Sequence, residues 1–270
     1  MNDTVPVNVS FVGAVPDLYE SFLGPFLFMP FAQDLACRMQ IGPRARVLEL
    51  ACGTGQLTRE LLAVMEPGAR LVATDLNVPM LSVARQRIRD PRVEWMEADV
   101  TRLPFEPGSF DEVVCQFGLQ FVQDKVAAAA QVRRVLKQGC PYHFNTWGSP
   151  ANNPLGRIAQ ETTEACFPED TPTFYRIPWS YHDTRKIESD LRAGGFKEVL
   201  IEGVEMIARA PSADHAAMGL VQGSPMAHVI EARDSVTVDA FTALIAAALT
   251  REFGPGPLAV PMHAWVVRAA

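Results

Sequence analysis

The sequence has no excess of basic residues. Lys and Arg number 24 against 31 Asp and Glu, so the formal net charge is −7, and no run of Lys and Arg is longer than two residues. Binding to nucleic acid depends largely on clustered Lys and Arg that neutralise phosphates. The composition therefore argues against a nucleic acid partner and favours a small organic molecule as substrate.

Paired cysteines, long apolar runs and a secretory leader are also lacking. The five cysteines include no CxxC pair, and no grouping of His, Cys and acidic residues has the spacing of a metal site. No uncharged stretch approaches the roughly 18 apolar residues of a membrane helix, and no secretory segment opens the sequence. We expect a cytoplasmic protein with reduced thiols, no metal and no membrane span, present as a monomer or a homodimer.

The stretch Val47–Leu57, VLELACGTGQL, carries the clearest local signal. The run Val47–Leu50 predicts a short buried strand, small residues then predict a turn, and helical spacing resumes at Gln56. Gly53 and Gly55 permit positive φ and let a ligand lie against the free N–H groups that begin the next helix. This turn is typical of a nucleotide site at the end of a first parallel strand.

The residues around the turn separate two classes of nucleotide. A dinucleotide-binding turn carries a third glycine where this sequence has Thr58, and Glu49 would repel a pyrophosphate. A cationic ligand would not be repelled. A nicotinamide oxidoreductase is therefore a less favoured alternative.

Acidic residues follow the next two predicted strands. Asp75 stands 20 residues after Gly55, the spacing at which a carboxylate meets ribose hydroxyls in nucleotide-binding βαβ units. Leu76 and Met80 come next and are expected to flank an adenine ring. Asp99, after the third strand, is expected to accept from the exocyclic amine of adenine.

Two patterns then carry a resemblance to a known family. One is ExxCGxG, from Glu49 to Gly55, and the other is AD-x(3)-LPF-x(3)-SFD-x-V, from Ala98 to Val113. The sequence thereby resembles class I methyltransferases that use S-adenosylmethionine (SAM), and in particular the type 11 subgroup with the ubiquinone and menaquinone C-methyltransferases. The resemblance implies an α/β, Rossmann-like sheet of strand order 3-2-1-4-5-7-6 with strand 7 antiparallel and with helical and aromatic lid insertions.

The resemblance also implies a cofactor site for SAM. In that family the acidic residue of the first motif lies beneath the methionine part of SAM, and the glycines pass close to it. The segment after the fourth strand lacks the Asn/Asp-Pro-Pro-Tyr/Phe motif of enzymes that methylate exocyclic amines. The cofactor-binding residues expected here are Glu49, Ala51, Gly53, Gly55, Gln56, Asp75, Leu76, Met80, Ala98, Asp99, Val100, Gln116 and Phe117.

The chain divides into a core and additions to it. Gly24-Pro25 is expected to break the first segment into two helices, and the segment after the fifth strand has an irregular, Pro-rich and aromatic pattern. We expect an N-terminal helical cap at 1–40, a SAM-binding core at 41–148, a substrate lid at 149–183, and the rest of the core at 184–270 with a helical insertion near 211–232.

Substrate and catalytic residues are expected among aromatic and histidine side chains. Because the methyl donor is already activated, a base is needed only if the acceptor must lose a proton. The candidates for this role are His182, His143 and Tyr19, and the substrate is expected to contact Phe28, Phe121, Trp147 and Tyr181. The acceptor atom, O, N or C, stays open, as does a SAM-binding fold without methyl transfer, used as a sensor or as a repurposed catalyst.

Overall fold

A seven-stranded mixed sheet forms the centre of the computed structural model, which describes residues 11–270. The strand order is β3-β2-β1-β4-β5-β7-β6, and β7 runs antiparallel to both β5 and β6, while the other neighbours are parallel. The predicted strand order and the antiparallel seventh strand are confirmed. The strands are β1 Arg46–Leu50, β2 Arg70–Asp75, β3 Val93–Glu97, β4 Glu112–Gln116, β5 Tyr142–Trp147, β6 Val199–Ala210 and β7 Leu258–Ala269.

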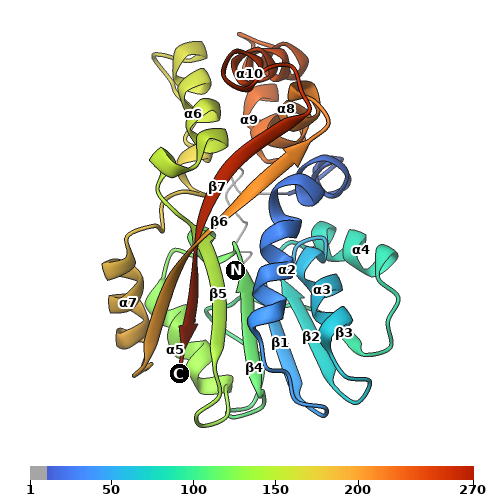
Figure 1. Cartoon of the computed structure of the whole chain (residues 1–270), viewed down its shortest axis with the longest axis vertical. Coiled ribbons are helices and arrows are strands. Elements are labelled where there is room, and N and C mark those ends of the chain that lie inside the picture. The colour runs from blue at the N-terminus through green and yellow to red at the C-terminus, as the bar shows by residue number, and fades with distance from the viewer. Residues whose placement is uncertain (1–10) are drawn as a thin grey trace.

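Helices cover both faces of the sheet (Figure 1). Successive strand residues point to opposite faces, so Val47 packs with α2 and α3 while its neighbour Leu48 packs with α5 and α7. This is why the parallel strands are apolar throughout. The helices are α2 Met29–Arg38, α3 Gln56–Val64, α4 Val78–Arg87, α5 Lys125–Val135 and α7 Thr184–Ala193.

A helical lobe surrounds the far ends of the two longest strands (Figure 1). β6 and β7 have 12 residues each, twice the length of β5, and they run beyond the parallel part of the sheet. The lobe consists of α6 Pro154–Cys166, α8 Ala213–Val221, α9 Met226–Glu231 and α10 Val238–Phe253. It lies above the same edge of the sheet at which the parallel strands end.

The segment after β5 is more regular than its sequence indicates. It contains the 13-residue helix α6, between the short 3-10 helices η4 Pro150–Asn152 and η5 Phe174–Arg176. Pro154 suits the first turn of α6, and Leu155, Ile158 and Ala159 are buried at helical spacing against α10 and β7. The expectation of an irregular segment is therefore wrong for α6, because the aromatic residues of the segment lie outside the helix and Pro154 stands at its first position.

The N-terminal helix runs without a break from residue 15 to residue 38. It begins as α1 Val15–Leu18, widens into the π-helix η2 Tyr19–Phe28, and continues as α2. In the π-helix the Met29 N–H bonds to the Gly24 carbonyl, five residues back, and this wider turn accommodates Pro25. The predicted break at Gly24-Pro25 is wrong for this reason.

Residues 1–10 of the expected N-terminal cap lie outside the described residues. Over residues 11–270, no helix has both the length and the apolar composition needed to cross a membrane.

Candidate functional site

The turn after β1 and the turn after β4 are pressed together at the carboxyl edge of the sheet. Ala51 and Phe117 both have positive φ, +50° and +47°, which is costly for residues with a Cβ. Gly118 makes the contact between the turns, because a Cβ there would lie 2.5 Å from the Ala51 Cβ. Strained backbone of this kind concentrates at functional sites.

Glu49 is a buried carboxylate with one partner. The Thr58 hydroxyl donates to its Oε2 at 2.6 Å, and its Oε1 has no hydrogen-bond partner among the described residues. Burial raises the pKa of Glu49 to about 8, and the nearby charge of Asp75 adds to the effect. Thr58, which stands at the third glycine position of a dinucleotide turn, therefore positions Glu49.

Asp75 fixes the glycine turn to the end of β2. Its Oδ2 accepts from the Gly53 N–H at 2.7 Å, and its Oδ1 accepts from the Asn77 N–H at 2.7 Å. Burial nevertheless leaves the pKa of Asp75 above its ordinary value. Both carboxylate oxygens thus have backbone partners, in contrast to those of Glu49.

The other expected cofactor residues follow the same edge with different exposure. Met80 is buried and faces the turn, since a Cβ on Gly53 would lie 3.5 Å from its Cε, whereas Leu76 is 46% exposed. Asp99 is exposed and accepts from the backbone N–H and hydroxyl of Thr101. Ala98 and Val100 are half-buried on either side of it.

The N-terminal helix covers this edge with aromatic side chains. Phe117 stacks on Trp147 with 3.8 Å between ring centroids, and Phe28 contacts both rings at 5.6 and 5.9 Å. Tyr19 stacks on Phe28 at 5.3 Å. Gln116 secures the cover, because its side-chain amide donates to the Phe28 carbonyl at 3.0 Å. The structure thus brings together five residues that the sequence suggested separately.

Tyr19 and Phe121 belong to the border of this aromatic group. Burial and the charges of Glu20 and Asp75 raise the pKa of Tyr19, so its phenol is neutral and suited to donate a hydrogen bond. Phe121 is half-buried and meets Phe11 edge-on at 6.4 Å.

Two expected residues lie away from this edge. His143 is buried at the amino end of β5, 3.3 Å from Glu112, which is the first residue of β4. Tyr181 packs on the opposite face, with α5 and α7, where its hydroxyl is 3.2 Å from Asp190. The structure does not support a base role for His143 or substrate contact for Tyr181, because each lies beside a buried carboxylate away from the glycine turn.

His182 contacts Trp179 of its own segment and Trp265 of β7. Its Nδ1 is 2.7 Å from the Trp179 carbonyl, and its own carbonyl accepts from the Trp265 indole at 3.0 Å. Neither contact links it to the glycine turn, and its proposed role stays a prediction.

Sequence reasoning missed Glu20, Gln120 and Asn145. Asn145 Oδ1 accepts from the Phe117 N–H at 3.1 Å, and Gln120 donates to the Phe117 carbonyl at 2.6 Å. Asn145 Nδ2 and Gln120 Oε1 have no partner within the described chain, and the same holds for Gln56 Oε1. A polar residue within an otherwise apolar run, as in FGLQF or HFNTW, is the sequence signal that could have identified the last two.

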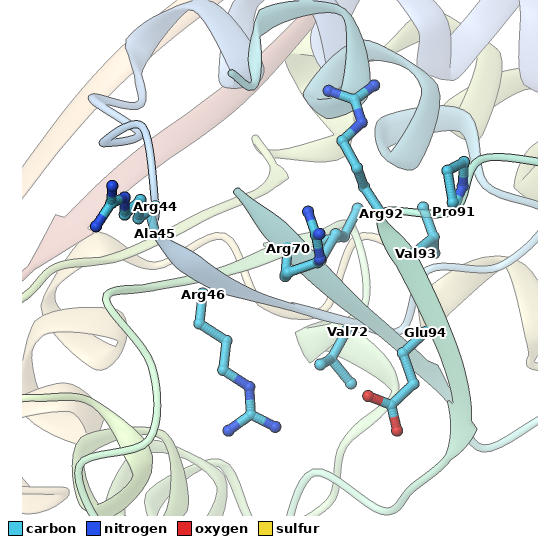
Figure 2. A pocket seen from close by; sticks show the side chains of 10 residues that line it. Arg44, Ala45, Arg46, Arg70, Val72, Pro91, Arg92, Val93 and Glu94 are labelled. Carbon is cyan, nitrogen blue, oxygen red and sulfur yellow. The ribbon is translucent and has the colours of Figure 1, made fainter. Parts of the chain in front are cut away.

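Two surface hollows lie elsewhere. One of about 480 Å³ lies at the amino ends of β1, β2 and β3 and is lined by Arg44, Arg46, Arg70 and Arg92 (Figure 2). The other, of about 600 Å³, lies between α6 and α10. Neither is lined by a residue of the glycine turn. The strand ends, with the unpartnered polar atoms of Glu49, Gln56, Gln120 and Asn145 around them, identify the candidate site, and these hollows do not.

A comparison with family models shows which known domain the residues around this edge resemble. The model for a methyltransferase domain matches residues 47–139, which include both turns, Glu49, Asp75 and Asp99. This segment of the chain is therefore similar to a methyltransferase domain. The matched segment begins within β1 and ends just after α5, and the N-terminal helix, the helical lobe and β5 to β7 lie outside it.

Known proteins resemble this chain to different extents. The ubiquinone/menaquinone biosynthesis C-methyltransferase of Ectopseudomonas mendocina is 36% identical over 122 residues, which are 44% of this chain and 48% of that protein. The chain spans about half the length of the curated relatives it matches.

Solved structures share the fold over much more of the chain. One is from the Haloferax volcanii complex between the Trm112 methyltransferase activator and its methyltransferase, with 17% identity, a TM-score of 0.58, and 97% of this chain and 99% of that chain covered. Another is a phosphoethanolamine N-methyltransferase 2 of Haemonchus contortus, bound to phosphomonomethylethanolamine and S-adenosylhomocysteine (SAH). It has 18% identity and a TM-score of 0.54, and the match covers 94% of this chain and 52% of that chain. The matched segment and the elements around it therefore share the Rossmann-like methyltransferase fold.

Proposed function

We propose that the protein is a SAM-dependent methyltransferase that methylates a small organic molecule. The observation that carries this proposal is Glu49, a carboxylate that is 1% exposed beside the glycine turn and has one oxygen without a partner. An unpartnered buried carboxylate is costly, and a positively charged ligand would relieve that cost. SAM carries both a sulfonium and an α-ammonium group.

The residues of the turn fit this cofactor. When bound, SAM supplies a methyl group on a positively charged sulfur, and SAH remains after transfer. In the proposal Glu49 attracts the cation, the turn backbone around Gly53 and Gly55 lies against the cofactor, and Met80 faces its adenine. Asp75 keeps the turn in place, and its carboxylate is the proposed partner of the ribose hydroxyls. The match of residues 47–139 to a methyltransferase domain supports the same cofactor.

The aromatic cover favours a small, partly apolar acceptor. Phe28, Phe117 and Trp147 exclude water from the edge at which transfer would occur. Tyr19, as a neutral phenol, would orient an acceptor by donating a hydrogen bond. The acceptor atom, O, N or C, is left open, and the 36%-identical C-methyltransferase of quinones places quinols among the first compounds to test.

The outer segments receive proposed roles as well. We assign the N-terminal helix to a cap over the cofactor, residues 41–148 to cofactor binding, and residues 149–183, with the helices at 211–232, to the substrate side. A cytoplasmic location and a monomeric or homodimeric state stay predictions.

Calorimetric titration tests the cofactor. We expect SAM and SAH to bind with micromolar dissociation constants and NADH not to bind. In Glu49→Gln the affinity for SAM should fall about tenfold more than the affinity for SAH if Glu49 faces the sulfonium, because SAH lacks that charge. An equal loss for both would place Glu49 at the α-ammonium group. Binding of NADH alone would contradict the proposal.

Methyl transfer is tested separately from binding. The protein is incubated with SAM labelled in its methyl group and with phenols, amines, carboxylates and quinols, and labelled product is measured with SAH formation. Product formation by the wild type that is lost in Gly53→Val would support the proposed methyltransferase activity. Tight SAM binding with no transfer to any acceptor would favour the alternative of a SAM-binding sensor or repurposed catalyst.

A further inference from the structure

Glu20 is an acidic side chain of the N-terminal helix that accepts three hydrogen bonds next to the glycine turn. It lies on the π-helix η2 and is only 6% exposed. Its Oε2 accepts from the Thr54 hydroxyl at 2.6 Å and from the Gln56 amide at 2.8 Å, and its Oε1 accepts from the Arg59 guanidinium at 3.0 Å. Arg87 of α4 approaches the same oxygen at 4.0 Å. One carboxylate of the N-terminal helix thus joins the turn, α3 and α4.

The surrounding backbone allows little freedom for this contact. A Cβ on Gly24 would lie 2.2 Å from the amide nitrogen of Gln56, and a Cβ on Gly223 would lie 3.2 Å from the Tyr19 backbone. The π-helix is therefore held between the glycine turn on one side and the segment after α8 on the other. Larger side chains at either glycine would separate Glu20 from its donors.

The position of Glu20 determines where the aromatic cover lies. Tyr19 is the preceding residue, and it stacks on Phe28, whose carbonyl receives the Gln116 amide. When Glu20 is bound to the turn, these groups cover the carboxyl edge of the sheet. If Glu20 were released, the N-terminal helix would keep the Gln116 contact and its apolar contacts but would lose its charged link to the turn.

We propose that Glu20 is a positioning residue that holds the N-terminal helix closed on the glycine turn and thereby controls how fast SAM and SAH enter and leave. The part that concerns ligand exchange rests on the proposed function. The part that concerns closure does not, because it follows from contacts within the chain. Glu20 itself touches neither the cofactor nor the acceptor in this scheme.

Glu20→Gln is the variant that tests closure. It keeps the shape of the side chain, but its amide group would face at least one of the three donors that now converge on the carboxylate, and the charge opposite Arg59 is lost. Asp190→Asn is the matched control, because Asp190 is also a buried carboxylate but bonds Tyr181 and Lys186 on the other face of the sheet.

Hydrogen exchange measured by mass spectrometry on the free proteins reports closure. We expect amides in residues 15–38 to exchange at least tenfold faster in Glu20→Gln, with residues 112–147 unchanged, and no such local increase in Asp190→Asn. Unchanged exchange in residues 15–38 would overturn the proposal. An increase of equal size in all segments would also overturn it, since Glu20 would then support only global stability.

Stopped-flow measurement of SAH dissociation tests the consequence. The dissociation rate should rise at least tenfold in Glu20→Gln and stay within twofold of the wild type in Asp190→Asn. Equal rates in all three proteins would overturn control of ligand exchange. If the wild type bound neither SAM nor SAH, the proposed function would fail, while the exchange data on the free proteins would still decide whether Glu20 holds the helix closed.

Discussion

Glu20 and Glu49 are buried carboxylates that meet the same glycine turn, but their surroundings differ. Glu20 comes from the N-terminal helix and receives three hydrogen bonds, whereas Glu49 comes from β1 and receives one. A carboxylate with all its donors is part of the folded structure, and its loss leaves donors unpaired. A carboxylate with a free oxygen is a cost to folding that a ligand can remove. The number of donors therefore distinguishes Glu20, which we assign to the folded structure, from Glu49, which we assign to ligand binding.

Asp75 has donors on both oxygens, as Glu20 does, and is also the proposed partner of the ribose hydroxyls, so its removal should have the largest effect. Asp75→Ala leaves the N–H groups of Gly53 and Asn77 without their acceptor, which costs about 1–3 kcal/mol for each buried group. We expect the free energy of unfolding to fall by about 3 kcal/mol in urea titration and SAH affinity to fall at least 100-fold by calorimetry. Asp75→Asn, which can still accept one of these bonds, should lose less. An Asp75→Ala protein with the wild-type free energy of unfolding would contradict the view that a carboxylate with donors on both oxygens stabilises the fold.

Glu49→Gln should raise the free energy of unfolding, in contrast to Asp75→Ala. The pKa of Glu49 is about 8 in the folded protein and near its ordinary value of 4.5 when unfolded, so the unfolded chain releases the proton first as pH rises. The wild type should therefore lose stability between pH 5 and pH 8, by up to about 1.4 kcal/mol per pH unit. The variant lacks this loss. In urea titration, its free energy of unfolding should therefore exceed that of the wild type by an amount that grows with pH.

Ligand binding provides a second measurement on the same residue. At pH 7 the Glu49 carboxyl is largely protonated, so binding of a cation should release close to one proton. Titration with SAM in buffers of different ionisation enthalpy measures that release. It should disappear in Glu49→Gln and persist in Glu20→Gln. Proton release that is lost in Glu20→Gln and kept in Glu49→Gln would show that Glu20, and not Glu49, is the carboxyl group that meets the cation.

The sequence predicts a region well when the structure of that region depends on residues that are close together in the chain. The turn around Gly53 and Gly55, the strand that ends at Asp75 and the strand order were predictable, because each follows from residues adjacent in the chain or from the pattern of a known family. Glu20 was not, because nothing near residue 20 indicates that Thr54, Gln56 and Arg59 will meet it.

The misjudged elements have the same origin. The Gly24-Pro25 pair predicts a break, but packing against Gln56 and the wider π-helical turn keep the helix continuous. His143 lies 3.3 Å from Glu112 on the adjacent strand, a contact that nothing in its own run YHFNTW indicates. In both cases a tertiary contact overrides the local pattern, so the N-terminal helix and the helical lobe are the regions where structure adds most.

The smallest expected effect concerns the strained backbone that presents Glu49. Ala51 has a φ of +50°, a conformation that costs a residue with a Cβ about 1 kcal/mol relative to glycine. Ala51→Gly should relieve this strain and raise the melting temperature by about 2 °C, offset in part by the greater freedom of glycine in the unfolded chain. The free glycine backbone should also weaken SAH binding about twofold, because the turn is then less firmly preorganised. A lower melting temperature would indicate that the Ala51 methyl group, packed against Gly118, contributes more than its conformation costs.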